Sequence, residues 1–302
     1  MVIRFLGVML VAAITVGVSV PVAFGEEAAK KIKLFILSGQ SNMVGYGDST
    51  QLPERLRKGN DRVLMFEDGK WQPLRPFKET NDRMKERQGM MEFSFGPEIA
   101  FGDEMAKAWP DETIGIVKQA IGATGILAWH PDWSKEQADR TNDGSKGPLF
   151  KALMAKVREG CESTDCEIMA LVWMQGGADM KEDSLGKEYL SNLKALVEGV
   201  RRETGVPDLP LILGSYRPGG MPDDLTGIDP SNYPDLKRPG ALYVLQAQYE
   251  AQKELAPAKM VPLRDLETHP RNVHFNTAGQ LELGKLFAKA YLELVKEEAG
   301  KP

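Results

Sequence analysis

Cysteine and histidine are both scarce in this chain. Its 302 residues include two cysteines and three histidines. So few of these side chains cannot build a cysteine-rich zinc module or a histidine-clustered metal site. We therefore expect neither a metal nor another cofactor. Any chemistry should come from hydroxyl groups, carboxylates and a very small number of imidazoles.

An excess of positive charge is also missing. Lysine and arginine number 38 against 43 aspartate and glutamate residues, which gives a net charge of −5. Such a surface repels polyanions on average, so a general nucleic-acid binder is not expected. The 42% hydrophobic and 27% charged residues are typical of a folded globular protein. The length suits one large α/β domain or two small ones.

The first 25 residues carry one charge, Arg4, and then an uncharged run from Phe5 to Phe24. Small residues, Ala23 and Gly25, end this run. The pattern is typical of a secretory signal peptide over residues 1–25 and predicts a secreted or periplasmic mature protein. The alternative is an uncleaved membrane anchor, because the run is long enough to span a bilayer. The remaining sequence has no second run of this length, so we expect no membrane association after cleavage.

Short apolar segments alternate with helical patterns along residues 26–302. Expected strands cover residues 32–37, 63–66, 113–120 and 167–173, and another begins at 211. Expected helices cover residues 96–108, 149–158, 185–203, 243–255 and 279–298. Apolar strands separated by helices indicate an α/β fold whose parallel sheet is covered on both faces. We find no internal repeat and no domain boundary, so we predict one domain over residues 26–302.

Three long polar segments interrupt this alternation, at residues 46–92, 131–147 and 217–240. Long loops in a domain of this kind are often functional. Each begins near the carboxyl end of an expected strand, where open parallel sheets bind ligands. The segments are therefore candidates for the walls of a cleft, with ordinary surface insertions as the alternative.

Cys161 and Cys166 flank a polar tetrapeptide between an expected helix and an expected strand. Because an exported protein meets an oxidising environment, a disulfide that closes this small loop is expected. Two free, buried thiols are the alternative.

A serine follows the first expected strand, in Gly39-Gln40-Ser41-Asn42-Met43. A tight turn at this point would place the Ser41 hydroxyl at the carboxyl edge of the sheet, as in a nucleophile elbow. Met43 stands where that elbow has its final glycine, and a serine after a strand can simply cap a helix. A serine nucleophile also needs a base. Of the three histidines, His274 lies in a loop before the last helix, although a structural role is equally open to it.

Five segments resemble, in order, the blocks of the SGNH hydrolases, in the form found in the sialate O-acetylesterase domain and carbohydrate esterase family six. The first is the Gly39–Met43 block above. The others are Ser94-Phe95-Gly96-Pro97-Glu98, Ala120-Ile121-Gly122-Ala123-Thr124 with Trp129, Trp173-Met174-Gln175-Gly176-Gly177-Ala178-Asp179, and Val273-His274-Phe275 with Gly279. The resemblance extends from Ile32 to the C-terminus.

This resemblance implies a three-layer α/β/α sandwich and the hydrolysis of acetyl esters of carbohydrate, either an acetylated polysaccharide or sialic acid. Ser41 would be the nucleophile and His274 the general base and acid. The oxyanion hole would consist of the backbone N–H groups of Ser41 and Gly122 and the side chain of Gln175. Trp129 is the one aromatic residue for which the family pattern supports a sugar-binding role.

Three positions depart from the family pattern. Arg271 stands where the family usually has the acid that orients the histidine, and Gly177 stands where some members place a glutamate for this purpose. Ala123 replaces a glycine of the second block. Another carboxylate could substitute, and the nearest in sequence are Asp179, Asp265 and Glu267, of which Asp179 is the tentative choice.

The same departures leave other interpretations open. A backbone carbonyl could hold the imidazole and leave a Ser–His dyad. The chain could instead be a weakened or inactive carbohydrate-binding protein on the same fold, since loss of the acid can cost several orders of magnitude in rate. An esterase directed at lipids is a lesser option.

Overall fold

The computed structural model describes residues 31–78, 93–229, 232–233, 236–270 and 272–301. The expected signal peptide at residues 1–25 and the departure at Arg271 lie outside these residues. Within the described part of the chain, no helix is both long enough and apolar enough to cross a membrane.

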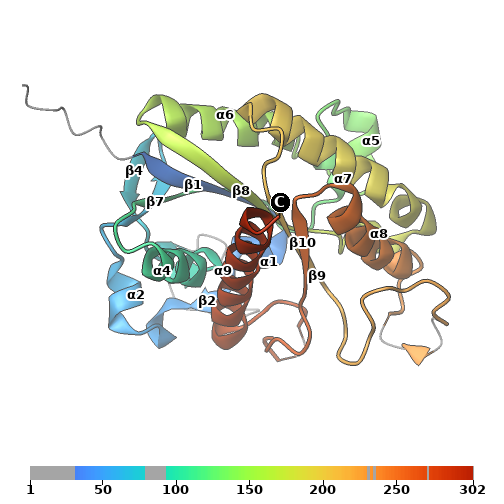
Figure 1. Cartoon of the computed structure of the whole chain (residues 1–302). Helices are drawn as coiled ribbons and strands as arrows, with labels where there is room; N and C mark the ends of the chain where they lie inside the picture. The colour runs from blue at the N-terminus through green and yellow to red at the C-terminus, as the bar shows by residue number, and fades with distance from the viewer. Residues whose placement is uncertain (1–30, 79–92, 230–231, 234–235, 271, 302) are drawn as a thin grey trace, which may run out of the picture.

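A seven-stranded sheet forms the centre of the molecule, in the order β10-β9-β8-β1-β7-β3-β4 (Figure 1). The strands are β1 (Ile32–Gly39), β3 (Val63–Glu67), β4 (Lys70–Pro73), β7 (Ile114–Ala120), β8 (Cys166–Met174), β9 (Leu211–Ser215) and β10 (Ala258–Pro262). All neighbouring pairs are parallel except β3 and β4. Without β3 and β4, the order is 2-1-3-4-5, as in flavodoxin-like sheets, and β1 lies at the point where the connections change direction.

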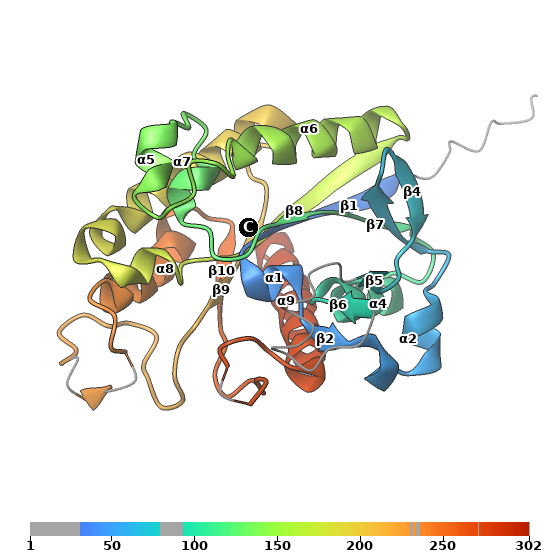
Figure 2. The same cartoon turned by 180° about the vertical axis from the view of Figure 1, so that it is seen from behind.

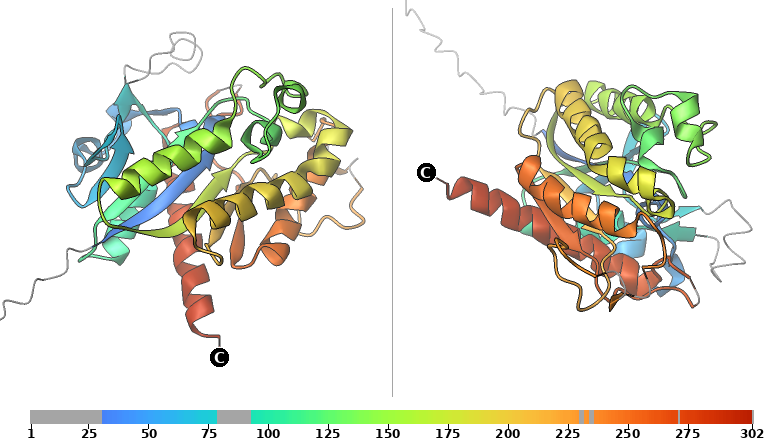
Figure 3. Two further views of the ribbon diagram at one scale, coloured as in Figure 1. Left: turned by 90° about the horizontal axis from the view of Figure 1, so that it is seen from above. Right: turned by 90° about the vertical axis from the view of Figure 1, so that its right-hand side faces the viewer.

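Helices cover both faces of this sheet, as the views from above and from the side show (Figure 3). One face packs against α6 (Leu149–Glu162), α7 (Asp183–Thr204) and α8 (Ala241–Glu254), and the other against α4 (Glu98–Ala108) and α9 (Thr277–Ala299). Strand β1 shows why. Leu34 and Ile36 enter the first core, while Phe35 and Leu37 enter the second. Because successive side chains of a strand point to opposite faces, a continuously apolar strand needs cover on both. The three-layer α/β/α fold is therefore confirmed.

The two edge strands of the sheet, β4 and β10, were not predicted from the sequence. Strand β4 returns antiparallel to β3 through a two-residue turn in which Asp68 and Gly69 have positive φ angles of 50° and 72°, as in a type I′ hairpin. Strand β10 is short, contains Lys259 and ends in Pro262, so its apolar signal is weak.

Short elements complete the fold (Figure 2). A small antiparallel sheet contains β2 (Gly47–Asp48), β5 (Phe77–Lys78) and β6 (Phe93–Phe95). The short helices are α1 (Ser41–Val44), α2 (Glu54–Lys58) and α5 (Lys135–Asp139), with 3₁₀ turns at Ser49–Gln51, Ile126–Trp129 and Asp179–Lys181.

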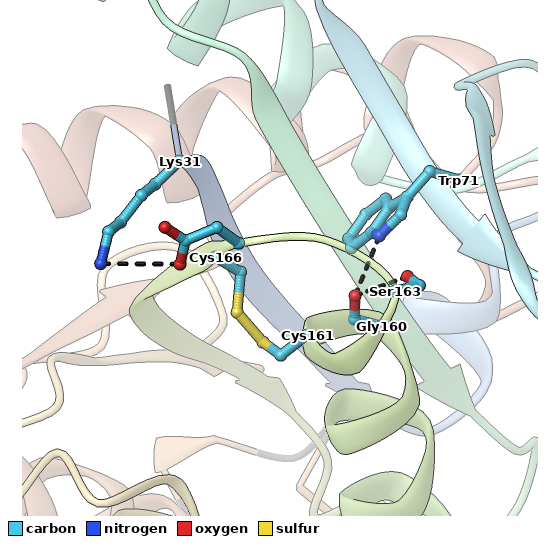
Figure 4. Close-up of a disulfide and its surroundings, with 7 residues drawn as sticks. Lys31, Trp71, Gly160, Cys161, Ser163 and Cys166 are labelled. Atoms are coloured by element: carbon cyan, nitrogen blue, oxygen red, sulfur yellow. Dashed lines mark hydrogen bonds and ion pairs between the residues drawn. A yellow bond between two sulfur atoms is a disulfide. The ribbon is translucent and has the colours of Figure 1, made fainter. Parts of the chain in front are cut away.

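A disulfide joins Cys161 at the end of α6 to Cys166 at the start of β8 (Figure 4). Their Cα atoms are 5.4 Å apart, and the bond closes the turn between the two elements, as expected from their spacing. Next to it, the Trp71 indole N–H donates to the Gly160 carbonyl over 3.1 Å. Because the disulfide lies at the amino end of β8, it stabilises the edge of the sheet opposite to the one that carries the loops of the candidate site.

Candidate functional site

Ser41 stands at the carboxyl edge of the sheet because β1 ends in a turn that requires glycine. Gly39 has a φ of 146°, and a Cβ atom built on it would lie 2.0 Å from the Met174 carbonyl oxygen. The following N–H, of Gln40, donates to that same oxygen over 2.9 Å. The chain is thereby held against β8 and turns directly into α1, whose first residue is Ser41. This is the topological switch point where such sheets bind ligands.

Ser41 and His274 line one cavity of about 430 Å³. Its lining residues come from α1 and the residue before it, from the segments after β7, β8 and β9, from the first residue of α8 and from the loop before α9. They are Gln40, Ser41, Asn42, Ala123, Gly177, Ala178, Met180, Lys181, Tyr216, Leu236, Lys237, Arg238, Ala241, Val273 and His274. Of the three long polar segments, 217–240 contributes to this wall, whereas no described residue of the other two does. The structure therefore brings the expected nucleophile and base to the same space.

Gly122 lies beside Ser41 at the end of β7. A Cβ atom built on Gly122 would be 3.9 Å from the Ser41 Cβ and 3.6 Å from the Tyr46 hydroxyl. Among the described residues, neither the Ser41 N–H nor the Gly122 N–H has a hydrogen-bond acceptor. Ala123, the next residue, has a φ of 57°, in the left-handed region that favours glycine. This geometry explains why the resembling family has a glycine there.

Gln175 does not have a free donor for an oxyanion. Its side chain is fully buried, and its Nε2 donates to the Thr124 carbonyl over 2.8 Å and to Asp179 Oδ2 over 2.6 Å. Exchanging the amide nitrogen and oxygen would place the oxygen against two other oxygens, the Thr124 carbonyl and Asp179 Oδ2. These two acceptors therefore determine the orientation of the amide. The prediction that Gln175 supplies an oxyanion donor therefore does not fit this geometry. The side chain instead ties the segment after β8 to the segment after β7.

Asp179 is paired with groups other than His274. Its carboxylate accepts hydrogen bonds from Gln175 Nε2 and, over 3.1 Å, from the Ile126 N–H. Burial raises the pKa of Asp179 to about 6. These contacts correct the tentative assignment of Asp179 as the acid that orients the imidazole. Asp179 instead holds Gln175 and the start of the 3₁₀ turn at Ile126.

The contacts found for the two other candidate carboxylates in the described part of the chain lead to groups other than His274. Glu267 Oε2 accepts from the Asn276 side chain over 3.2 Å. Asp265 is exposed and lies next to Gly219, where a Cβ would come within 2.8 Å of Oδ1. At Gly177, the position of the family's glutamate, a Cβ would lie 2.9 Å from Gln40 Nε2, so a longer side chain would have to displace Gln40.

Trp129 is a packing residue. Its side chain is fully buried and meets Trp173 edge-on, with 5.4 Å between ring centroids. Its indole N–H donates to the Thr124 hydroxyl over 3.1 Å. Because no part of Trp129 reaches the surface, the suggestion that it binds a sugar is wrong. The residue supports the Thr124 segment instead.

Two residues lie near His274 for which the sequence predicted no contact with it. The Tyr46 ring lies 4.4 Å from the imidazole, centroid to centroid. Asn42, next to Ser41, forms hydrogen bonds to the backbone on both sides of His274. Asn42 belongs to the same block as Ser41, and this position was the only signal available for it.

The high pKa of Asp179 predicts a pH dependence of stability. The folded-state pKa of about 6 lies above the usual 3.8, so the folded protein holds this proton more tightly than the unfolded chain does. This contribution is complete below pH 4 and is lost as the pH rises through 6, a change of about 3 kcal/mol. Asp179→Asn cannot titrate. We expect its unfolding free energy, measured with urea at pH 4 to 7, to rise relative to the wild type by about this amount. A pH-independent difference would contradict the assignment.

The described residues contain no group of three or more His, Cys, Asp or Glu side chains that could hold a metal ion.

Comparison with known proteins gives consistent results. A family model described as "Carbohydrate esterase, sialic acid-specific acetylesterase" matches residues 31–293. A protein of Arabidopsis thaliana, named a probable carbohydrate esterase, is 25% identical over 275 residues, which cover 86% of this chain and 90% of that protein.

Solved structures show the same fold. An Arabidopsis thaliana protein has a TM-score of 0.65 at 22% identity, covering 87% of this chain and 98% of that one. NanS has a TM-score of 0.61 at 16% identity, with 89% and 98% coverage. A carbohydrate acetylesterase from Xanthomonas citri has a TM-score of 0.57 at 16% identity, with 88% and 57% coverage.

Proposed function

The chain belongs to the sialic acid-specific acetylesterase family of carbohydrate esterases, and from this premise we propose that it is a secreted or periplasmic serine esterase that removes O-acetyl groups from carbohydrate. The observation that carries the proposal is the presence of Ser41 and His274 on the wall of one cavity, at the switch point of the sheet. The family supports ester hydrolysis and an acetylated carbohydrate substrate. Export and the roles of individual residues go beyond what the family shows.

In the proposed reaction, the Ser41 hydroxyl attacks the acetyl carbonyl and His274 takes its proton. The N–H groups of Ser41 and Gly122 donate to the oxygen as it becomes negative. Collapse of the tetrahedral intermediate breaks the bond to the sugar oxygen, which receives the proton from His274. Water, deprotonated by His274, then attacks the acetyl-Ser41 ester, and acetate leaves as the serine recovers its proton.

The charge of the cavity favours an acidic sugar. Lys181, Lys237 and Arg238 are exposed at its wall, and none of the described residues that line it carries a carboxylate. Arg238 also donates to the Gly177 carbonyl over 2.6 Å, which fixes it beside the segment after β8. In a chain with a net charge of −5, a local cluster of cations attracts negatively charged ligands. A sugar that carries a carboxylate, as sialic acid does, suits this wall better than a neutral one.

One observation supports a second candidate function. The hydrogen bonds found for Asp179 and Glu267 in the described part of the chain lead to Gln175, Ile126 and Asn276. If neither of these carboxylates orients the imidazole, the protein could bind an acetylated sugar and hydrolyse it only weakly. A carbohydrate-binding protein on the esterase fold is therefore the alternative function.

The test measures acetate release by residues 26–302, with Ser41→Ala as the blank. The substrates are O-acetyl sialic acid, an acetylated xylo-oligosaccharide of neutral charge and 4-nitrophenyl acetate. We expect release above the blank. We also expect kcat/KM to be about tenfold higher for the acidic sugar at low salt, with the preference decreasing as salt is added. Equal rates for both proteins would refute the esterase, and binding without turnover would support the alternative. Equal kcat/KM values for the two sugars would refute only the charge preference.

A further inference from the structure

The side chain of Asn42 links the helix that carries Ser41 to the loop that carries His274. Asn42 is 1% exposed. Its Nδ2 donates to the Val273 carbonyl over 3.1 Å, and its Oδ1 accepts from the Phe275 N–H over 2.9 Å. These are the carbonyl immediately before His274 and the N–H immediately after it. One amide therefore holds the peptide groups on both sides of the imidazole-bearing residue.

The orientation of this amide is fixed by its partners. The Nδ2 group also donates to the Tyr216 hydroxyl over 3.1 Å. Turning the amide over would place its NH₂ against the Phe275 N–H and its oxygen against the Val273 carbonyl, so both contacts would become repulsive. The site thus requires a donor and an acceptor on one short, planar side chain. Aspartate would lose the donor, and alanine would lose both groups.

The other described contacts of the His274 loop run to Tyr46, to residues 267–269 and to the loop itself. The His269 ring nitrogen lies 2.8 Å from the Tyr46 carbonyl oxygen, and the Tyr46 ring packs on the imidazole. The His269 N–H donates to the His274 carbonyl over 2.9 Å, and the Asn276 N–H donates to the Glu267 carbonyl over 3.1 Å. The Asn272 side chain accepts from the Val273 N–H over 2.8 Å. These contacts keep the loop folded on residues 267–269 and on itself. The Asn42 side chain is the group of α1 that bonds directly to the peptide groups on both sides of His274.

We propose that Asn42 is the positioning residue that sets His274 relative to Ser41. Because Ser41 and Asn42 are consecutive residues of α1, a displacement of the loop changes the distance between the nucleophile and its base. The proposal rests on the proposed function for its effect on rate. Its effect on the position of the imidazole can be measured whether or not the protein is an esterase.

The chain offers a matched control at the same residue. Gln280 on α9 is fully buried, and its Nε2 donates to the backbone carbonyl of Asn42 over 3.3 Å. Gln280→Met removes this buried hydrogen bond and leaves the Asn42 side chain with its partners at Val273 and Phe275. A general loss of packing around Asn42 would therefore affect Gln280→Met and Asn42→Ala alike. Loss of the Asn42 side-chain hydrogen bonds to Val273 and Phe275 affects only Asn42→Ala.

The first measurement is histidine NMR on the labelled protein, which is simple to assign because there are three histidines. We expect Asn42→Ala to shift or broaden the ring resonances and to change the titration of His274, with His130 unchanged. Gln280→Met should leave the spectrum close to that of the wild type. Unchanged His274 resonances in folded Asn42→Ala would overturn the proposal. So would equal changes in both variants. This result does not depend on catalysis.

The second measurement is steady-state hydrolysis of the best acetylated substrate. We expect Asn42→Ala and Asn42→Asp to lower kcat by about 100-fold, the scale of a displacement of about 1 Å in a reacting group, with KM within threefold. Gln280→Met should stay within about threefold of the wild-type kcat. A fall in kcat no larger than that of Gln280→Met, or a loss confined to KM, would overturn the proposal. If the wild type itself releases no acetate, the proposed function fails and the NMR result alone decides the role of Asn42.

If Asn42→Ala does not fold, Asn42→Ser is the second variant for both measurements. The serine hydroxyl can replace at most one of the two Asn42 hydrogen bonds to the His274 loop. We therefore expect smaller changes in the His274 spectrum and in kcat, in the same direction as for Asn42→Ala. A His274 spectrum and a kcat equal to those of the wild type in this variant would overturn the proposal.

Discussion

Replacing Ser41 or His274 by alanine is expected to lower kcat by about 10⁴- to 10⁶-fold, and replacing both is expected to cost no more than replacing one. The reason is that the two side chains act as a unit. Without the imidazole the hydroxyl is not deprotonated as it attacks, and without the hydroxyl the imidazole has no proton to take. Both line the same cavity, which is the geometric requirement for this dependence.

The measurement is acetate release under single-turnover and steady-state conditions for the two single variants and the double variant. His130→Ala is the control, because the His130 ring accepts a hydrogen bond from the Asp132 N–H and is not among the residues that line the cavity. It should keep wild-type kcat. Losses that multiply in the double variant would show that Ser41 and His274 act independently, which the proposed mechanism does not allow.

A residual rate above the uncatalysed one is expected to survive in the double variant. The Ser41 backbone N–H remains after the substitution, as does the Gly122 N–H beside it, and these donors can still stabilise an oxyanion. This residual activity would distinguish a site with a preformed oxyanion hole from a cavity that merely contains a serine and a histidine.

The sequence was sufficient to predict which segments meet at the site. Ser41, Gly122 and His274 follow apolar strands or precede the last helix, and the carboxyl ends of parallel strands converge at one edge. The alternation of buried side chains in β1 likewise determined the layers. The layers follow from local patterns, whereas the joint assignment of Ser41, Gly122 and His274 was implied by the resemblance to the esterase blocks.

The direction of individual side chains could not be inferred in the same way. Gln175, Asp179 and Trp129 occupy the expected positions in the chain, yet all three are fully buried. The Gln175 amide is turned by the Thr124 carbonyl and by Asp179, which belong to two different segments. Such orientations depend on partners that are distant in sequence, so the block pattern predicted the location of these residues but not what they contact.

Breaking a buried ion pair near the site is expected to cost much of the protein's stability. Lys118 of β7 donates to Glu98 Oε2 over 2.6 Å, and their side chains are 7% and 1% exposed. Glu98 Oε1 also accepts from the Gly96 N–H over 2.9 Å. We expect Lys118→Met to lower the unfolding free energy by about 3–5 kcal/mol, because it leaves the Glu98 carboxylate buried without its cation.

Urea unfolding at pH 7 measures this loss, and two further variants test its cause. Lys58→Met removes the cation of an exposed pair with Glu54 and should cost much less, since surface pairs contribute little. Combining Lys118→Met with Glu98→Gln should recover most of the loss, because no buried charge then remains unpaired. A double variant as unstable as Lys118→Met would show that the cost comes from packing rather than from charge.

The same pair also bears on catalysis, because the Lys118 ammonium donates to the Val44 carbonyl over 2.7 Å. Val44 is the last residue of α1, and Lys118 lies four positions before Gly122. One ammonium group thus joins the helix of Ser41 to the strand that leads to Gly122, the two sources of the proposed oxyanion donors. We therefore expect Lys118→Met to lower kcat under conditions where the variant remains folded. The double variant Lys118→Met/Glu98→Gln should recover stability without recovering kcat, because neither variant has the ammonium group that contacts the Val44 carbonyl.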